Sequence, residues 1–180
     1  QHGAPRDHGL ARVGIGIVDR AAHLVGAAGV RRPDFTDPAP QVRMSVLIAA
    51  PRATVFRTMM DPALVNQWFS AEAARVDPVQ GGEYRLGWEY KIDGRDVVGG
   101  TTRILELVPG EKLVLDWLEW RGDTSVPPQF ISFTLEDEGS GTRVNFVHGG
   151  FTRTADLSDY PWGWAYFVGE LQKVAMAQLA

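Results

Sequence analysis

The sequence has no cysteine among its 180 residues. This absence excludes disulfide bonds, zinc–thiolate clusters and cysteine nucleophiles. It is typical of a reducing compartment. No signal peptide is recognisable, because charged residues such as Arg12, Asp19 and Arg20 interrupt the early apolar residues. The sequence therefore predicts a cytoplasmic protein.

Long apolar runs and an excess of positive charge are missing as well. The chain lacks the run of about eighteen apolar residues that a membrane-spanning helix needs, so we expect no membrane span. The formal net charge is −4 and the basic residues form no stripe, which argues against nucleic acid as a partner. No nucleophile elbow, phosphate-binding loop or paired-histidine zinc motif occurs. The sequence thus predicts neither a metal ion nor a cofactor.

Tryptophan is what the chain has in unusual number. Six tryptophans are present, and five of them fall between Trp88 and Trp164. Bulky rings with a polar edge occur both in solid cores and in ligand pockets. The second half of the chain therefore holds most of the candidate binding residues.

Residues 1–41 differ in composition from the rest of the chain. They are rich in Gly, Ala, His and Arg, and they end in a proline-bearing stretch over residues 32–40. Apolar residues there could form one stripe of a short helix, but several glycines weaken it. We expect a partly helical or flexible extension over residues 1–41, followed by one domain over residues 42–180. The extension could also dock on a second copy and form a homodimer.

Residues 42–68 carry the signals of a strand followed by two short helices. Residues 42–48 are a run rich in β-forming residues. Pro51 suits the start of a helix, and Asp61 before Pro62 repeats that signal, as an N-cap residue followed by proline at the first helical position. The second helix is expected to end near Trp68.

From Tyr84 to His148 apolar and polar residues alternate, which is the period of half-buried strands. Turn signals at residues 93–94, 109–110 and 139–141 separate the runs, and the Gly99-Gly100 pair predicts a bulge or bend. The predicted inward faces are Tyr84, Leu86, Trp88 and Tyr90; Leu113, Leu115, Trp117 and Glu119; Ile131, Phe133 and Leu135; and Val144, Phe146 and His148.

The C-terminal segment changes to helical spacing. A cap at Ser158 or Asp159 and Pro161 in the first turn predict a helix of roughly twenty residues. Its apolar stripe comprises Trp164, Phe167, Val168, Leu171, Val174, Ala175 and Leu179. The order of elements predicts an α+β fold, in which a curved antiparallel sheet wraps around the long C-terminal helix.

Several short motifs are similar to those of a known family. They are Ile48 to Pro51 with Val55-Phe56, Asp61-Pro62, Trp68-Phe69, Gly81 to Leu86, Ile104 to Pro109 before Lys112 to Val114, Trp117, Gly141 to Val144, His148 to Phe151, and Gly163-Trp164 with Leu171. In order and spacing they resemble the START-like (SRPBCC) superfamily, and within it the homologues of the activator of the heat-shock-protein-90 ATPase. The resemblance covers about residues 42–180.

The resemblance implies a helix-grip fold with an internal cavity between the sheet and the long helix. It also implies binding of apolar molecules such as lipids, sterols or polyketides and, in some members, cyclisation or hydrolysis. Ligand pockets are mostly apolar with a few polar groups, whereas a solid core filled by the same rings is the alternative. The predicted ligand-binding residues are Trp68, Tyr84, Trp88, Tyr90, Trp117, Glu119, Phe133, Phe146, His148, Trp164, Phe167 and Leu171.

His148 and Glu119 are the candidate polar groups of that cavity. His148 could orient a ligand or act as acid or base near neutral pH; the alternative is a structural histidine bonded to a backbone carbonyl. Glu119 would have a raised pKa if it faced an apolar cavity, unless the strand ends before it and the carboxylate is solvated. With Tyr90 the two could form a polar end of the cavity.

Three functions follow from these features. The leading hypothesis is a non-enzymatic domain that binds a small hydrophobic molecule. The second is a cyclase- or hydrolase-type enzyme that uses the same cavity, with His148 or Glu119 as the acid–base residue. The third is a chaperone-partner module, which needs an exposed surface patch that the sequence does not make obvious.

Overall fold

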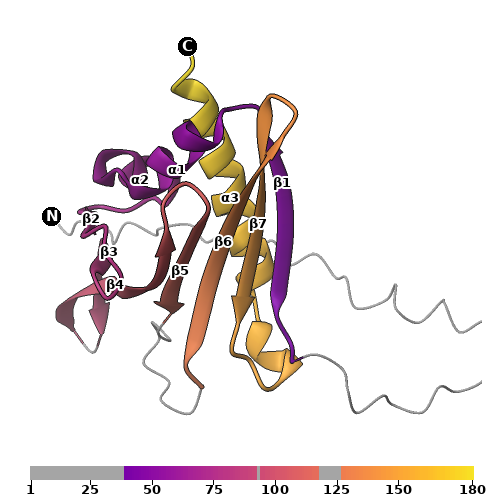
Figure 1. The fold of residues 1–180 in the computed structure, drawn as a ribbon. Coiled ribbons are helices and arrows are strands. Elements are labelled where there is room, and N and C mark those ends of the chain that lie inside the picture. The colour runs from indigo at the N-terminus through magenta and orange to yellow at the C-terminus, as the bar shows by residue number, and fades with distance from the viewer. Residues whose placement is uncertain (1–38, 93, 118–126) are drawn as a thin grey trace, which may run out of the picture. The chain divides into compact units, whose positions relative to one another are not determined.

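The computed structural model describes residues 39–92, 94–117 and 127–180, which belong to a compact unit spanning Pro38–Ala180 (Figure 1). The side chains of Tyr90, Ile92 and residues 95–98 are not among those described. The extension predicted over residues 1–41 falls almost wholly outside the described residues and stays a prediction.

Strands contribute more residues to this unit than helices do, and one long helix ends it (Figure 1). The elements are, in chain order, β1 (Val42–Ile48), α1 (Arg52–Met60), α2 (Pro62–Trp68), β2 (Arg75–Val76), β3 (Glu83–Ile92), β4 (Arg95–Val108), β5 (Lys112–Trp117), β6 (Gln129–Glu138), β7 (Gly141–Gly149), η1 (Thr154–Leu157) and α3 (Tyr160–Ala177). Within the described residues the strands form one curved antiparallel sheet in the order β1-β7-β6-β5-β4-β3-β2. This arrangement confirms the predicted α+β helix-grip fold.

The predicted inward faces meet in one core as far as their side chains are described, with Trp88 only partly buried against it. The alternate residues of β5, β6 and β7 are buried, and α3 runs along this face of the sheet with its apolar stripe turned inward (Figure 1). The buried side chains of α3 are Tyr160, Trp164, Val168, Leu171 and Ala175. Alternation along the strands and helical spacing in α3 therefore predicted the packed faces correctly.

The stripe predicted for α3 was wrong at its last member. The helix ends at Ala177, and Leu179 lies beyond it with 54% of its surface exposed. The apolar spacing continued past the residue where the chain leaves the helix. Spacing alone carries no stop signal, and none of the usual C-terminal signals, such as glycine after the last turn, occurs here.

The two short helices begin where the sequence predicted. α1 starts directly after Pro51, and Asp61 is the N-cap of α2. The Asp61 carboxylate accepts a hydrogen bond from the backbone N–H of Ala63 at 2.9 Å, while Pro62 occupies the first helical position. An N-cap carboxylate of this kind satisfies an N–H that has no partner inside the helix.

The bend predicted at Gly99-Gly100 is a bulge in the pairing of β3 with β4. Arg85 pairs with Thr101 and Trp88 pairs with Gly99, so two β3 residues lie opposite Gly100 alone. The extra residue therefore belongs to β3, across from the glycine pair. A second irregularity follows where β4 pairs with β5, between Ile104 and Glu106.

Two short elements were not predicted. The two-residue strand β2 pairs with β3, and the 3-10 turn η1 precedes α3. Both are too short to show a period in the sequence.

None of the helices in the part of the chain that the structure describes is long and apolar enough to span a membrane.

Candidate functional site

Five aromatic side chains gather around Phe69 on the face of the sheet that α3 covers. The ring of Phe69 lies 4.4 Å from Trp68, 5.0 Å from Phe167, 5.8 Å from Trp164, 5.9 Å from Trp88 and 6.0 Å from Trp117, measured between ring centroids. We call these six residues the ring cluster. They come from the end of α2, from β3 and β5, and from α3. The fold thus brings together rings that lie up to about a hundred residues apart in the sequence.

Phe69 is central to the ring cluster, yet it was absent from the predicted ligand-binding residues. It follows α2 as the C-cap residue, and it is fully buried. The neighbouring Trp68, which was predicted, instead donates its indole N–H to the Thr58 carbonyl of α1 at 3.0 Å. A residue just past the end of a helix belongs to no periodic pattern, so the sequence does not indicate which way its side chain points. The only signal for Phe69 was its place beside Trp68 in an aromatic pair.

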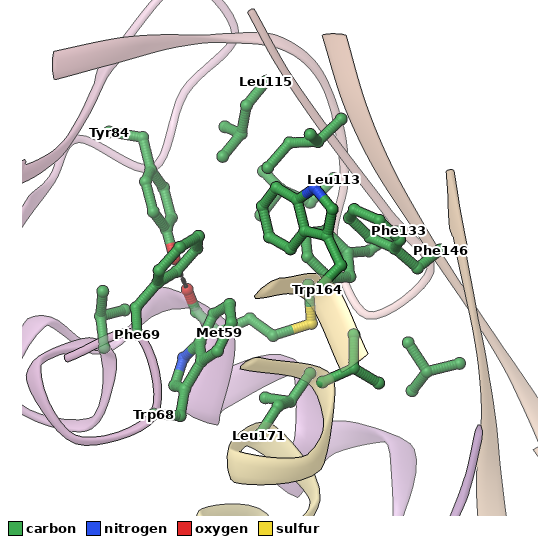
Figure 2. Close-up of a cluster of buried hydrophobic side chains, with 14 of the residues drawn as sticks. Met59, Trp68, Phe69, Tyr84, Leu113, Leu115, Phe133, Phe146, Trp164 and Leu171 are labelled. Carbon is green, nitrogen blue, oxygen red and sulfur yellow. Dashed lines mark hydrogen bonds between the residues drawn. The ribbon is translucent and has the colours of Figure 1, made fainter. Parts of the chain in front are cut away.

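Further buried aromatic side chains pack beside the ring cluster. Phe133 and Phe146 lie 5.0 Å apart on neighbouring strands, and Phe146 lies 4.5 Å from Trp164. Figure 2 shows these rings together with Leu171 of α3 and with Tyr84, whose hydroxyl donates to the Met59 carbonyl at 2.7 Å. Burial raises the pKa of the Tyr84 hydroxyl far above its ordinary value, so it stays protonated. These residues of the predicted set therefore belong to the buried core beside the ring cluster.

A chain of side-chain hydrogen bonds crosses one end of the ring cluster. Trp164 donates from Nε1 to Nδ1 of His148 at 2.9 Å, and Nε2 of His148 lies 2.7 Å from Oε1 of Gln129. His148 is fully buried, as the alternation in β7 predicted. Both its ring nitrogens are therefore bonded to side chains, rather than to the backbone carbonyl that the structural alternative assumed.

The direction of this hydrogen-bond chain follows from the chemistry of tryptophan. An indole nitrogen can donate and has no lone pair with which to accept. Nδ1 of His148 must then be the acceptor, which places the ring proton on Nε2, and Oε1 of Gln129 accepts from it. Burial also lowers the pKa of His148 to about 3, so the ring is neutral at ordinary pH.

Two donors at this end of the cluster have no acceptor among the residues that the structure describes. They are Nε2 of Gln129 and Nε1 of Trp117. Gln129 is 4% exposed and Trp117 is 6% exposed, so bulk water does not reach them freely. The two residues are direct cross-strand partners in the pairing of β5 with β6, and their side chains therefore leave the sheet on the same face.

Gln129 was not among the predicted site residues, although the sequence carries its signal. It lies two residues before Ile131, at the inward register that continues through Phe133 and Leu135. Extending that alternation by one step would have placed an amide on the inner face. A polar residue at an inward position is the observation that the prediction passed over.

Two members of the ring cluster reach the surface. Trp88 and Phe167 are partly exposed and pack against the core, whereas Phe69, Trp164 and Trp117 are buried. The indole N–H of Trp88 donates to the Ser70 carbonyl at 3.0 Å. Contacts between rings thus run without a break from the partly exposed Trp88 and Phe167 to the buried His148.

Two predicted site residues fall outside what the structure describes. They are Glu119 and the side chain of Tyr90. The predicted polar end formed by Tyr90, Glu119 and His148 is therefore tested only at His148, where Gln129 and Trp164 supply the polar contacts. Over the described residues, no group of three or more His, Cys, Asp or Glu side chains could hold a metal ion.

Comparison with known proteins identifies the family. Residues 49–175 match the family described as Activator of Hsp90 ATPase homolog 1-like protein, which is more than half of the chain. No curated protein matches the sequence significantly.

Solved structures show the same fold. A protein from Nitrosomonas europaea is 20% identical, covers 77% of this chain and 95% of its own, and has a TM-score of 0.60. An Hsp90 activator from Plasmodium falciparum is 14% identical over 74% of this chain and 94% of its own, with a TM-score of 0.58. The Aha1 dimer from Colwellia psychrerythraea is 18% identical over 76% and 96%, with a TM-score of 0.57. Because the family match and the fold agree, the protein belongs to the Activator of Hsp90 ATPase homolog 1-like family, within the START-like (SRPBCC) superfamily.

Proposed function

We propose that the protein binds a small apolar molecule on the inner face of the sheet, against the ring cluster. The observation that carries this proposal is the aromatic surface that leads from the partly exposed Trp88 and Phe167 to the buried Phe69. Exposed apolar surface that continues into a buried ring cluster is typical of a ligand site. Proteins of this fold family commonly bind hydrophobic ligands, which supports the same function.

Binding would be driven by removal of apolar surface from water. That transfer contributes about 25 cal/mol per Å² of apolar area. Aromatic pairs add about 0.5–1.5 kcal/mol each beyond the area term. A flat aromatic ligand would therefore fit this surface best, since it could pack edge-to-face or offset against Phe69, Trp88 and Phe167.

Titration with naphthalene and biphenyl tests the proposal. We expect saturable binding, seen as a rise in melting temperature and as quenching of tryptophan fluorescence. A ligand at one hundred times its Kd stabilises the folded state by about 2.7 kcal/mol. The F167E variant should lose this binding, because a carboxylate at the partly exposed edge of the cluster would have to be desolvated.

Y166E is the matched control. Tyr166 is the neighbouring residue of α3, and 56% of its surface is exposed. The Y166E variant adds the same charge one position away from Phe167, and we expect this variant to bind both hydrocarbons as the wild type does. Absence of saturable binding in the wild type, or equal binding by F167E and Y166E, would contradict the proposed function.

Acid–base catalysis at His148 is less well supported than binding. Both ring nitrogens are occupied by Trp164 and Gln129, and burial keeps the ring neutral. A general base needs a free lone pair within reach of the substrate proton. The enzyme alternative would therefore require this hydrogen-bond chain to break.

A protein partner is the second candidate, favoured by one surface feature. Trp162 and Tyr166 lie four residues apart on α3 and are 71% and 56% exposed. Side chains at this spacing share one helix face, and exposed aromatic residues are common anchors of interfaces. These two exposed rings support the partner hypothesis, for which the sequence made no exposed patch obvious. Calorimetric titration with a purified Hsp90 tests it: wild type should bind and the W162A/Y166A double variant should not.

A further inference from the structure

At the buried end of the ring cluster, the side-chain polar atoms of Trp117 and Gln129 that lack a partner among the described residues are both hydrogen-bond donors. The hydrogen-bond chain starts at Trp164, passes through His148 and ends at Gln129, and every step runs in the same direction. Because Oε1 of Gln129 already accepts from His148, the outer group of the amide is Nε2, which carries two hydrogens. The Trp164 indole, far from the amide in the sequence, thereby fixes which end of Gln129 is free.

Trp117 adds a second donor of the same kind beside Gln129. The two are opposed across β5 and β6, which places their Cβ atoms about 5 Å apart. Trp117 also packs on the ring cluster, with its ring 5.2 Å from Trp164 and stacked at 6.0 Å from Phe69. Its Nε1 and the Gln129 Nε2 are both buried without an acceptor among the described residues. Buried donors are rarely left unpaired, since this costs about 1–3 kcal/mol each.

We propose that the bound molecule carries a neutral carbonyl oxygen that accepts hydrogen bonds from Trp117 Nε1 and Gln129 Nε2. This inference rests on the proposed function and adds the chemical class of the ligand: an aromatic or otherwise apolar ketone, ester or amide. A carbonyl oxygen has two lone pairs and can accept from both donors at once. The rest of the ligand would lie along the ring cluster toward Trp88 and Phe167.

The charge of the surroundings selects a carbonyl over a carboxylate. The buried polar residues among those described are Thr58, Thr102, Gln129, Thr142 and His148, none of which is an acid, a lysine or an arginine. Among the described residues a carboxylate at this depth would therefore lack a buried positive partner, and burial of an unpaired charge is far more costly than burial of a neutral polar group. A neutral carbonyl oxygen can therefore bind the neutral donors of Trp117 and Gln129 without burying a charge.

Paired ligands that differ in one atom test this inference. The ketones acetophenone, 2-acetylnaphthalene and 4-acetylbiphenyl are each compared with the alkene in which CH2 replaces the carbonyl oxygen. We measure Kd for both members of a pair and take the ratio of alkene Kd to ketone Kd. Two hydrogen bonds predict a ratio of roughly tenfold or more in the wild type. The infrared carbonyl stretch of the bound ketone should also lie at lower frequency than in hexane.

Two variants remove the donors and one variant serves as the control. Q129E keeps an oxygen for His148 but loses the amide hydrogens, and W117F keeps a ring but loses the N–H. Each should lower the ratio by at least about threefold. W88F removes the same atoms from a member of the ring cluster whose N–H is already bonded to Ser70. It should weaken both members of a pair alike and leave the ratio unchanged.

The possible results separate this inference from the proposed function. If neither ketones nor alkenes bind the wild type, the proposed function fails and the inference fails with it. If both bind, but the ratio is the same in wild type, Q129E and W117F and the carbonyl stretch matches that in hexane, the binding function stands and the carbonyl site is wrong. The infrared result comes from the wild type alone, so it decides the question even if a donor variant does not fold.

Discussion

The indole N–H of Trp164 in α3 donates a hydrogen bond to Nδ1 of His148 in β7 over 2.9 Å. Both side chains are buried. The bond joins the long helix to the sheet, and through Gln129 it continues to the end of β6. A single contact between two residues sixteen positions apart thus sets the histidine tautomer and the orientation of a buried amide.

Trp164→Phe should therefore destabilise the protein strongly. The change removes the donor, leaves Nδ1 of His148 buried without a partner and creates a small cavity beside Phe146. We expect the free energy of unfolding to fall by about 3 kcal/mol, measured by urea denaturation. Trp162→Phe is the matched control on the same helix, because Trp162 is 71% exposed. Its effect should stay within about 0.5 kcal/mol, and an equal loss in both variants would contradict the role of the buried bond.

The buried His148 should also make stability depend on pH. In the unfolded chain a histidine takes up a proton near pH 6.5, whereas in the folded protein burial lowers its pKa to about 3. Between these values the unfolded state binds more protons. The contribution is fully present above about pH 6.5 and is lost as the pH falls toward 3. We expect a loss of about 2 kcal/mol in the free energy of unfolding between pH 7 and pH 5.

The control for this pH dependence is His148→Gln. Its amide can accept from Trp164 but does not titrate, so the variant should lose most of the slope between pH 7 and pH 5, whatever its absolute stability. Carboxylates titrate mainly below this range. The three other histidines lie in the first 23 residues and are unchanged in the variant. Equal slopes in the two proteins would show that His148 is not the responsible group.

Alternation and helical spacing carried most of the fold prediction. The inward residues of β5, β6 and β7 repeat at every second position, and those of α3 at every third or fourth. Such periods arise because one face of each element must be buried, so a single sequence suffices to find them. Turn residues and the Asp61-Pro62 signal then fixed most of the element ends.

The site was predicted less completely, for reasons of geometry. The alternation correctly turned Trp117 and His148 inward, but it cannot say which inward side chains touch across the sheet and the helix. The Trp164–His148 bond depends on the rotation of α3 relative to β7, which no local pattern records. Phe69 lies outside any period, and Gln129 was passed over because an amide is unexpected at an inward position. These three features define the proposed ligand site.

Tyr84→Phe tests the link between the sheet and α1. The buried Tyr84 hydroxyl donates to the Met59 carbonyl at 2.7 Å. Its removal leaves that carbonyl without this donor, and we expect a loss of about 1–2 kcal/mol in the free energy of unfolding. Tyr166→Phe makes the same chemical change where 56% of the side chain is exposed, and it should have no measurable effect. Urea denaturation of the two variants side by side would reject the link if their losses were equal.

The close packing at the bulge opposite Gly100 predicts that a side chain at this position destabilises the protein. Gly110 provides the comparison. Gly100 has φ of +70°, and an added Cβ would lie 3.0 Å from Cβ of Leu86 and 3.1 Å from Cε3 of Trp88. Gly110, in the turn between β4 and β5, has a similar φ of +76° with nothing within 4 Å of such a Cβ. The two positions share the backbone cost of a side chain at positive φ and differ only in the space around it.

Gly100→Ala should therefore cost more than Gly110→Ala. In the left-handed region an alanine costs about 1–2 kcal/mol relative to glycine, and both variants should show this loss. At position 100 the methyl group must also displace the Trp88 ring or open the bulge, which adds about 1–3 kcal/mol. Because Trp88 lies 5.9 Å from Phe69 in the ring cluster, its displacement should also shift the tryptophan emission of the folded protein. If both variants lost the same free energy of unfolding and kept the wild-type emission, the close approach at Gly100 would be wrong.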